Sequence, residues 1–281
     1  MRRRLARPEG DSPGHEDANR VVRSFRERAL WPIESFVDFF RDWLRRFFEV
    51  QGFDRAMAIG AYAYSALIPA VIVYSALVSN EGSFADTLVN KFELTGSAAD
   101  AVRAAFGSST TVQSSISWFG GLLLIIAALS FARAMQRLYE GAFGLPPLSM
   151  RNTNWALLWL LLLFVAAAVR PVIDRGPVTG LILSAAIWLA TPYLLLGRRV
   201  HWSRLVGVSL LSALGMSGVG IYSVIYMPHA IGDSAEQYGV FGIGFALLSW
   251  LFVSACVLVA AATGGAMVTE RIEQHREAKA A

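Results

Sequence analysis

The chain has 281 residues, of which 55% are apolar and only 16% are charged. Because an ordinary soluble domain carries about 25% charged residues, this composition excludes a typical water-soluble globular protein. The single cysteine, Cys256, excludes an intramolecular disulfide, and the formal net charge of +4 calls for no nucleic-acid partner.

The N-terminal region divides into two segments of different character. Residues 1–28 are charged, contain Pro and Gly and are poor in aromatic side chains, so we expect a disordered basic and polar tail. Residues 30–50 alternate aromatic and charged side chains at helical spacing, which predicts an amphipathic helix. This helix suits the inner membrane interface, and packing against the cytoplasmic ends of a helix bundle is an equal alternative.

The remaining charges leave six long uncharged intervals. They comprise residues 56–80, 104–132, 152–169, 176–197, 205–232 and 237–269. Each has at least 18 residues, the length at which an apolar stretch is a candidate transmembrane helix. The sequence therefore predicts an all-α, polytopic membrane protein with six transmembrane helices.

The predicted transmembrane domain covers residues 56–269. Its spans lie at about 56–78, 115–133, 153–170, 178–197, 205–227 and 240–267. Between the first two spans, residues 79–114 form an outer segment with two short helices separated at Gly96, and residues 270–281 form a cytoplasmic tail. Gly215, Gly218 and Gly220 in the fifth span are interpreted as helix-packing positions, with bending as the alternative.

Basic residues set the predicted orientation, because they concentrate in cytoplasmic loops. With a cytoplasmic N-terminus, the segments on that side hold 21 of the 25 lysine and arginine residues. We therefore expect both termini in the cytoplasm and a basic inner face beside anionic lipid head groups.

The stretch "LSFARAMQRLYEGAFG", residues 129–144, carries the first candidate site. Arg133, Arg137 and Glu140 lie at i, i+4 and i+7 and so share one helix face beside Gln136. The helix is expected to continue about two turns past the membrane, with Arg137 and Glu140 paired. Two interpretations stay open: a positive-inside anchor, or an inner gate that binds a lipid head group.

Two further sets of residues are weaker candidates. A central cavity is expected to be lined by Tyr62, Ser65, Pro69, Ser217 and Tyr222. Arg170 and Asp174 form a candidate outer rim, with a snorkelling arginine and a short turn as the alternative. His229, beside Pro228, is placed on an outer loop.

Enzymatic motifs are missing from the sequence. The four histidines, at positions 15, 201, 229 and 275, are dispersed and none has metal-ligand spacing with an acid or cysteine. We expect no catalysis, no cofactor and no metal. The spans also contain no carboxylate, the simplest group to carry a proton or sodium ion in coupled transport. This favours a lipid- or amphiphile-handling protein, a passive pore or a structural component.

The chain resembles the YihY/BrkB family of bacterial inner-membrane proteins over residues 30–270. The resemblance rests on the first span ending Leu67-Ile68-Pro69, on "AMQRLY" at 134–139, and on "YGVFG" with Trp250 in the sixth span. Gln136 stands where the family commonly has Asn. The family often ends the sixth span with Gly-Ala-Glu, where this chain has Ala261, Ala262 and Thr263, so any role of that acid is absent or relocated here.

The resemblance implies a multi-pass protein of the bacterial inner membrane. Its function would be transporter-like or in envelope integrity, with a lipid-like or small amphiphilic substrate. A non-transporting envelope scaffold is the alternative, and a membrane-bound ribonuclease, a label that some members carry, is a third. Expected partners are membrane lipids, anionic on the cytoplasmic side, and either further copies of the chain or other envelope proteins.

Overall fold

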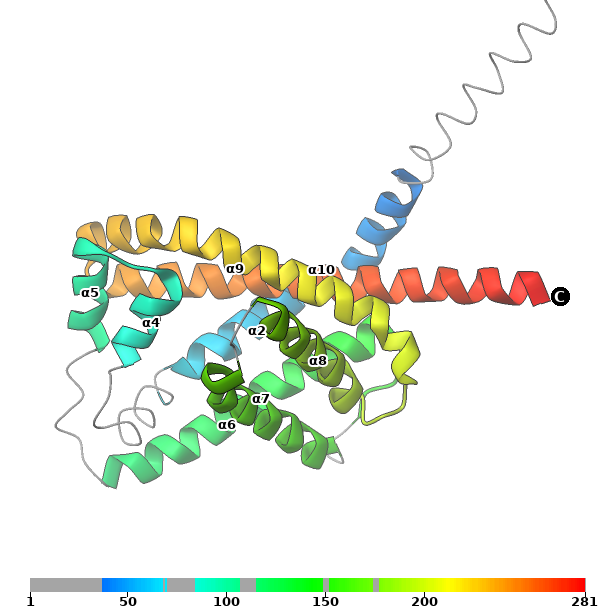
Figure 1. Cartoon of the computed structure of the whole chain (residues 1–281), viewed down its shortest axis with the longest axis horizontal. Coiled ribbons are helices and arrows are strands. Elements are labelled where there is room, and N and C mark those ends of the chain that lie inside the picture. Colours follow the sequence, from blue (N-terminus) through cyan, green and yellow to red (C-terminus); the bar gives the residue numbers. More distant parts are fainter. Residues whose placement is uncertain are drawn as a thin grey trace, which may run out of the picture. The chain divides into compact units, whose positions relative to one another are not determined.

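The structure, a computed structural model, describes residues 37–67, 69, 84–106, 115–148, 152–173 and 177–280. The regular elements in this part of the chain are all helices (Figure 1). They are α2 (Gly52–Ser65), α4 (Phe84–Phe92), α5 (Gly96–Phe106), α6 (Ser115–Ala142), α7 (Thr153–Ile173), α8 (Pro177–Leu195), α9 (Trp202–Tyr238) and α10 (Val240–Ala280). The predicted all-α class is confirmed.

The chain separates into two compact units, Met1–Arg46 and Phe47–Ala281. Residues 37–49, within the predicted 30–50 helix, are helical, and several of their aromatic side chains, including Phe40 and Phe48, are exposed. The predicted tail at 1–28 lies outside the described residues. Every feature below belongs to the second unit.

Three helices are long and apolar enough to cross a membrane. They are Phe119–Ala142, Trp202–Tyr238 and Val240–Lys279, which correspond to the second, fifth and sixth predicted spans. Thr153–Ala166 and Ile182–Leu195 are shorter apolar helical segments within α7 and α8. The first predicted span is described only at its start, as α2.

Helices α9 and α10 form an antiparallel hairpin that turns at Gly239, whose φ of 61° favours glycine. The two helices have 37 and 41 residues and so extend about 55 and 60 Å, well beyond a hydrocarbon core of about 30 Å. The Trp250 indole donates to Ser223 Oγ at 2.5 Å, which sets the register of the hairpin. In this register residues near 227 face residues near 246.

The expectation that Pro228 and His229 lie on a loop is wrong, because both are inside α9. Proline removes one backbone hydrogen bond, but the helix continues where packing holds both sides of it. Met227 and Ile231 are buried on either side of the proline, and the helix continues through Gly232 to Tyr238. The predicted tail at 270–281 likewise continues α10 as helix to Ala280.

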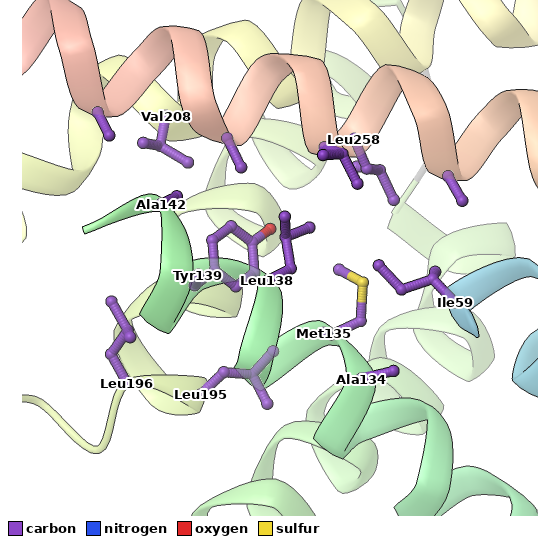
Figure 2. Close-up of a cluster of buried hydrophobic side chains, with 14 of the residues drawn as sticks. Ile59, Ala134, Met135, Leu138, Tyr139, Ala142, Leu195, Leu196, Val208 and Leu258 are labelled. Carbon is purple, nitrogen blue, oxygen red and sulfur yellow. The ribbon is translucent and has the colours of Figure 1, made fainter. Parts of the chain in front are cut away.

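Buried side chains form two separate cores. The first core collects residues of α2, α6, α7, α8, α9 and α10, and Figure 2 shows Met135, Leu138 and Tyr139 of α6 within it, with Leu258 of α10 nearby. The second core joins α4 and α5 to the turn end of the α9–α10 hairpin, through residues such as Phe92, Val102 and Ile243. The two short helices predicted around Gly96 are confirmed.

Glycines let α9 and α10 approach closely near Gly207 and Gly265. A Cβ on Gly265 would overlap backbone atoms of Val208. The predicted packing role of the fifth-span glycines holds for Gly215, where an added Cβ would lie 2.7 Å from Val257 Cγ1. It does not hold for Gly218 and Gly220, which face open space.

We predict that Gly265→Ala destabilises the protein by about 1–3 kcal/mol, because backbone atoms cannot move aside as a side chain can. Gly218→Ala is the matched control: it adds the same methyl group to open space and should be neutral or stabilising by up to about 1 kcal/mol. Thermal unfolding of the two detergent-solubilised variants measures the difference. Equal melting temperatures would show that the close crossing is not needed.

Candidate functional site

The candidate site lies at the C-terminal end of α6, which we call the α6-end site. Helix α6 runs unbroken through Arg133, Arg137 and Glu140, as predicted, and stops at Ala142. Gly144 has φ 61° and donates its N–H to the Gly141 carbonyl, while Leu145 donates to the Glu140 carbonyl at 2.8 Å. These two bonds form a Schellman motif, which ends the helix and turns the chain into residues 145–148.

The two faces of this helix end have different surroundings. Ala134, Met135, Leu138 and Tyr139 are buried in the first core (Figure 2). Gln136 and Glu140 are also buried, whereas the Arg133 side chain is half-buried and that of Arg137 is exposed. The four predicted residues are thus together but in different environments.

Glu140 is the centre of the site, with a side chain only 4% exposed. Its Oε1 accepts hydrogen bonds from Gln136 Nε2 at 2.8 Å, from the Leu148 backbone N–H at 2.7 Å and from Arg199 Nη2 at 3.2 Å. Three donors, one of them charged, offset the cost of burying a carboxylate. The carboxylate therefore joins α6 to the loop before α7 and to the turn after α8.

The expected pairing of Arg137 with Glu140 is wrong, since the partner of Glu140 is Arg199. An exposed i, i+3 pair gains only a few tenths of a kcal/mol. Arg199 offers more, because it also donates to the Pro146 carbonyl at 3.0 Å and to the Leu196 carbonyl at 3.2 Å. Arg199 lies 59 residues away in sequence, so helical spacing gave no signal for it.

Asn152 is a second residue that the sequence did not assign to this site. Its amide donates to Gln136 Oε1 at 3.3 Å and to the Leu195 carbonyl at 2.9 Å. Gly197, with φ 60°, lies so close that an added Cβ would be 2.9 Å from Asn152 Oδ1. The buried polar chain therefore ties α6, the start of α7 and the end of α8 into one unit.

Three arginines surround this polar centre. Arg55 of α2 donates from Nη1 to the Arg137 carbonyl, and Arg133 donates from Nη2 to Thr153 Oγ1 at 3.4 Å. Burial lowers the pKa of Arg55 from its ordinary value, and the nearby Arg137 charge lowers it further while Glu140 opposes the change. Within the described residues, Arg55, Arg133 and Arg137 form no ion pair with a carboxylate.

Two cavities flank this end of α6. The α2-side cavity, about 410 Å³, is lined by residues including Gln51, Asp54 and Arg55. The α7-side cavity, about 300 Å³, is lined by residues including Arg133, Gln136 and Thr153. Arg137 and Glu140 line both, so the arginine face borders space that a ligand can enter.

The other predicted residues do not join this site. Tyr62, Ser65, Ser217 and Tyr222 are exposed and line neither of these two cavities, so the central cavity stays a prediction. Tyr222 instead stacks on Tyr226, with ring centroids 5.0 Å apart. Pro69 is buried beside undescribed residues, Arg170 lies in α7 with an undescribed side chain, and Asp174 is outside the described residues.

The polar groups of the site are mainly hydrogen-bond donors. Its groups are guanidinium, amide and hydroxyl donors, and its one buried carboxylate already accepts three hydrogen bonds. Across the described part of the chain, no group of three His, Cys, Asp or Glu residues is placed to hold a metal ion. The arrangement suits an anionic ligand or head group.

Comparison of this chain with protein-family models, with curated proteins and with solved structures finds no match.

We predict that Glu140→Gln destabilises the protein by about 1–3 kcal/mol, because it leaves Arg199 without its anionic partner and weakens the bonds to the loop. Glu236→Gln, on an exposed stretch of α9, is the matched control and should change stability by less than about 0.5 kcal/mol. Thermal unfolding in detergent measures both. Equal unfolding of the two variants would contradict a central role for Glu140.

Proposed function

We propose that this chain is a multi-pass protein of the bacterial inner membrane, of the YihY/BrkB type, with six spans and both termini in the cytoplasm. In this proposal it binds a lipid-like or small amphiphilic molecule at the α6-end site, in a transporter-like or envelope-integrity role. The six uncharged intervals and the distribution of basic residues support the topology. The three long apolar helices support the membrane location.

The observation that carries the proposal is the pair of charged cavities at the end of an apolar span. An amphiphile needs a polar site for its head group next to an apolar surface for its chain. Arg133 and Thr153 line the α7-side cavity, and α7 continues from there with exposed Leu157, Leu161 and Phe164. Both requirements are thus met within a few turns of α6 and α7.

A scaffold role is the second candidate, and the second core favours it. α4 and α5 pack on the turn end of the α9–α10 hairpin, away from the α6-end site. Arg103 Nε pairs with Asp86 Oδ1 at 3.1 Å and braces these two helices. A protein that acts through partners would depend on the outer surface of this pair rather than on the arginines.

The proposed topology predicts thiol labelling from one side only. In a Cys256→Ser background, Ser97→Cys on exposed α5 should react with a membrane-impermeant maleimide in intact spheroplasts, and Ala278→Cys near the end of α10 should not. Both should react after permeabilisation, which controls for accessibility. Labelling of Ala278→Cys in intact spheroplasts would contradict a cytoplasmic C-terminus.

The proposed binding site predicts that Arg133→Ala retains membrane insertion but binds amphiphiles about tenfold more weakly, because charge-assisted hydrogen bonds are lost. Native mass spectrometry of protein purified in a maltoside detergent measures the lipids that remain bound. Arg276→Ala, on the exposed end of α10, is the control. Unchanged lipid retention in Arg133→Ala would leave that residue as a topology anchor only.

A further inference from the structure

The arginines in the described part of the chain differ in whether they pair with an acid. Arg103, Arg199 and Arg204 each form an ion pair with an aspartate or glutamate. Arg133 and Arg137, on one face of α6, form none within the described residues. The acid nearest to them in sequence, Glu140, is already bound to Arg199.

The uncompensated charges lie close together, with the Arg133 side chain half-buried and that of Arg137 exposed. Arg133 and Arg137 are one helical turn apart, which places their Cβ atoms about 6 Å from each other. Arg55 adds a third guanidinium, since it donates to the Arg137 carbonyl from the opposite side. Like charges held together at the edge of a membrane protein are stabilised by a bound counter-anion.

The depth of the site matches the head-group layer. In the proposed topology the second span ends at about residue 133, and Arg137 lies about one helical turn, or about 6 Å, beyond that end. The hydrocarbon core is about 30 Å thick, and the head groups extend several Å beyond it. In that topology Arg133 and Arg137 lie at the level of the lipid phosphates.

We propose that the α7-side cavity, which Thr153 also lines, binds a phosphate group carried by an amphiphile, with Arg133 and Arg137 as its charged ligands. This inference rests on the proposed function and adds the chemical class of the head group. Guanidinium groups match phosphate oxygens with two parallel N–H donors, and two arginines balance a doubly charged phosphate monoester better than a single carboxylate. The neutral donors of Gln136 and Asn152 are already used within the protein.

The test measures ligand-induced thermal stabilisation of the full-length protein in maltoside micelles. The ligands are dioctanoyl phosphatidic acid, dioctanoyl phosphatidylcholine, octanoate and inorganic phosphate. We expect phosphatidic acid to bind at least about tenfold more tightly than phosphatidylcholine or octanoate. Equal binding of inorganic phosphate would support the phosphate site and assign it to the free anion.

Variants connect the binding to the site. Arg133→Gln and Arg137→Gln should each weaken phosphatidic acid binding about tenfold. Arg137→Lys keeps the positive charge but loses the paired N–H donors of the guanidinium group, so it should weaken binding less. Arg198→Gln removes a positive charge from the exposed turn after α8, outside both cavities, and should bind as wild type does. Should the glutamine variants fail to fold, the lysine variant and the ligand preference of the wild-type protein decide.

Three results would overturn the inference. These are equal binding of phosphatidylcholine, preferred binding of octanoate, and unchanged phosphatidic acid binding in folded Arg133→Gln and Arg137→Gln. Any of them leaves the proposed function intact as long as some amphiphile binds. Absence of binding by every amphiphile tested would overturn both.

Discussion

The buried carboxylate of Glu140 is the interaction on which the α6-end site depends. A carboxylate with 4% exposure persists only if donors replace its hydration, and here they come from three different segments of the chain. Gln136 belongs to the same helix, Leu148 to the loop before α7 and Arg199 to the turn after α8. Satisfying one acid therefore fixes the relative positions of three helix ends.

This arrangement also determines which charges remain for a ligand. Because Glu140 is paired with Arg199, Arg133 and Arg137 of α6 have no acidic partner among the described residues. Both arginines line the α7-side cavity, and Arg137 also lines the α2-side cavity. The positive charge at this site therefore depends on the fold and not on the composition, since the formal net charge of the whole chain is only +4. A positive-inside anchor and an anion site need not exclude each other, since in the proposed topology the same arginines would serve both.

The long helices could be predicted from the sequence because the exclusion of charge from an apolar helix is a local property of the chain. The uncharged intervals located α6 to α10. The pairing inside the site could not be predicted in this way. Arg199 and Asn152 come close to α6 only through tertiary folding, so their sequence spacing from α6 gave no sign of the contact. Pro228 was predicted to lie on a loop because the burial of Met227 and Ile231 beside it depends on tertiary packing, which the local sequence does not show.

The same long hairpin connects the two ends of the molecule that carry the competing functions. The close crossing of Gly207 and Gly265 lies next to the first core, and the Gly239 turn is enclosed by the second core with α4 and α5. Since α9 and α10 are continuous helices, a shift of one relative to the other at the glycine crossing would be transmitted along the pair to the turn.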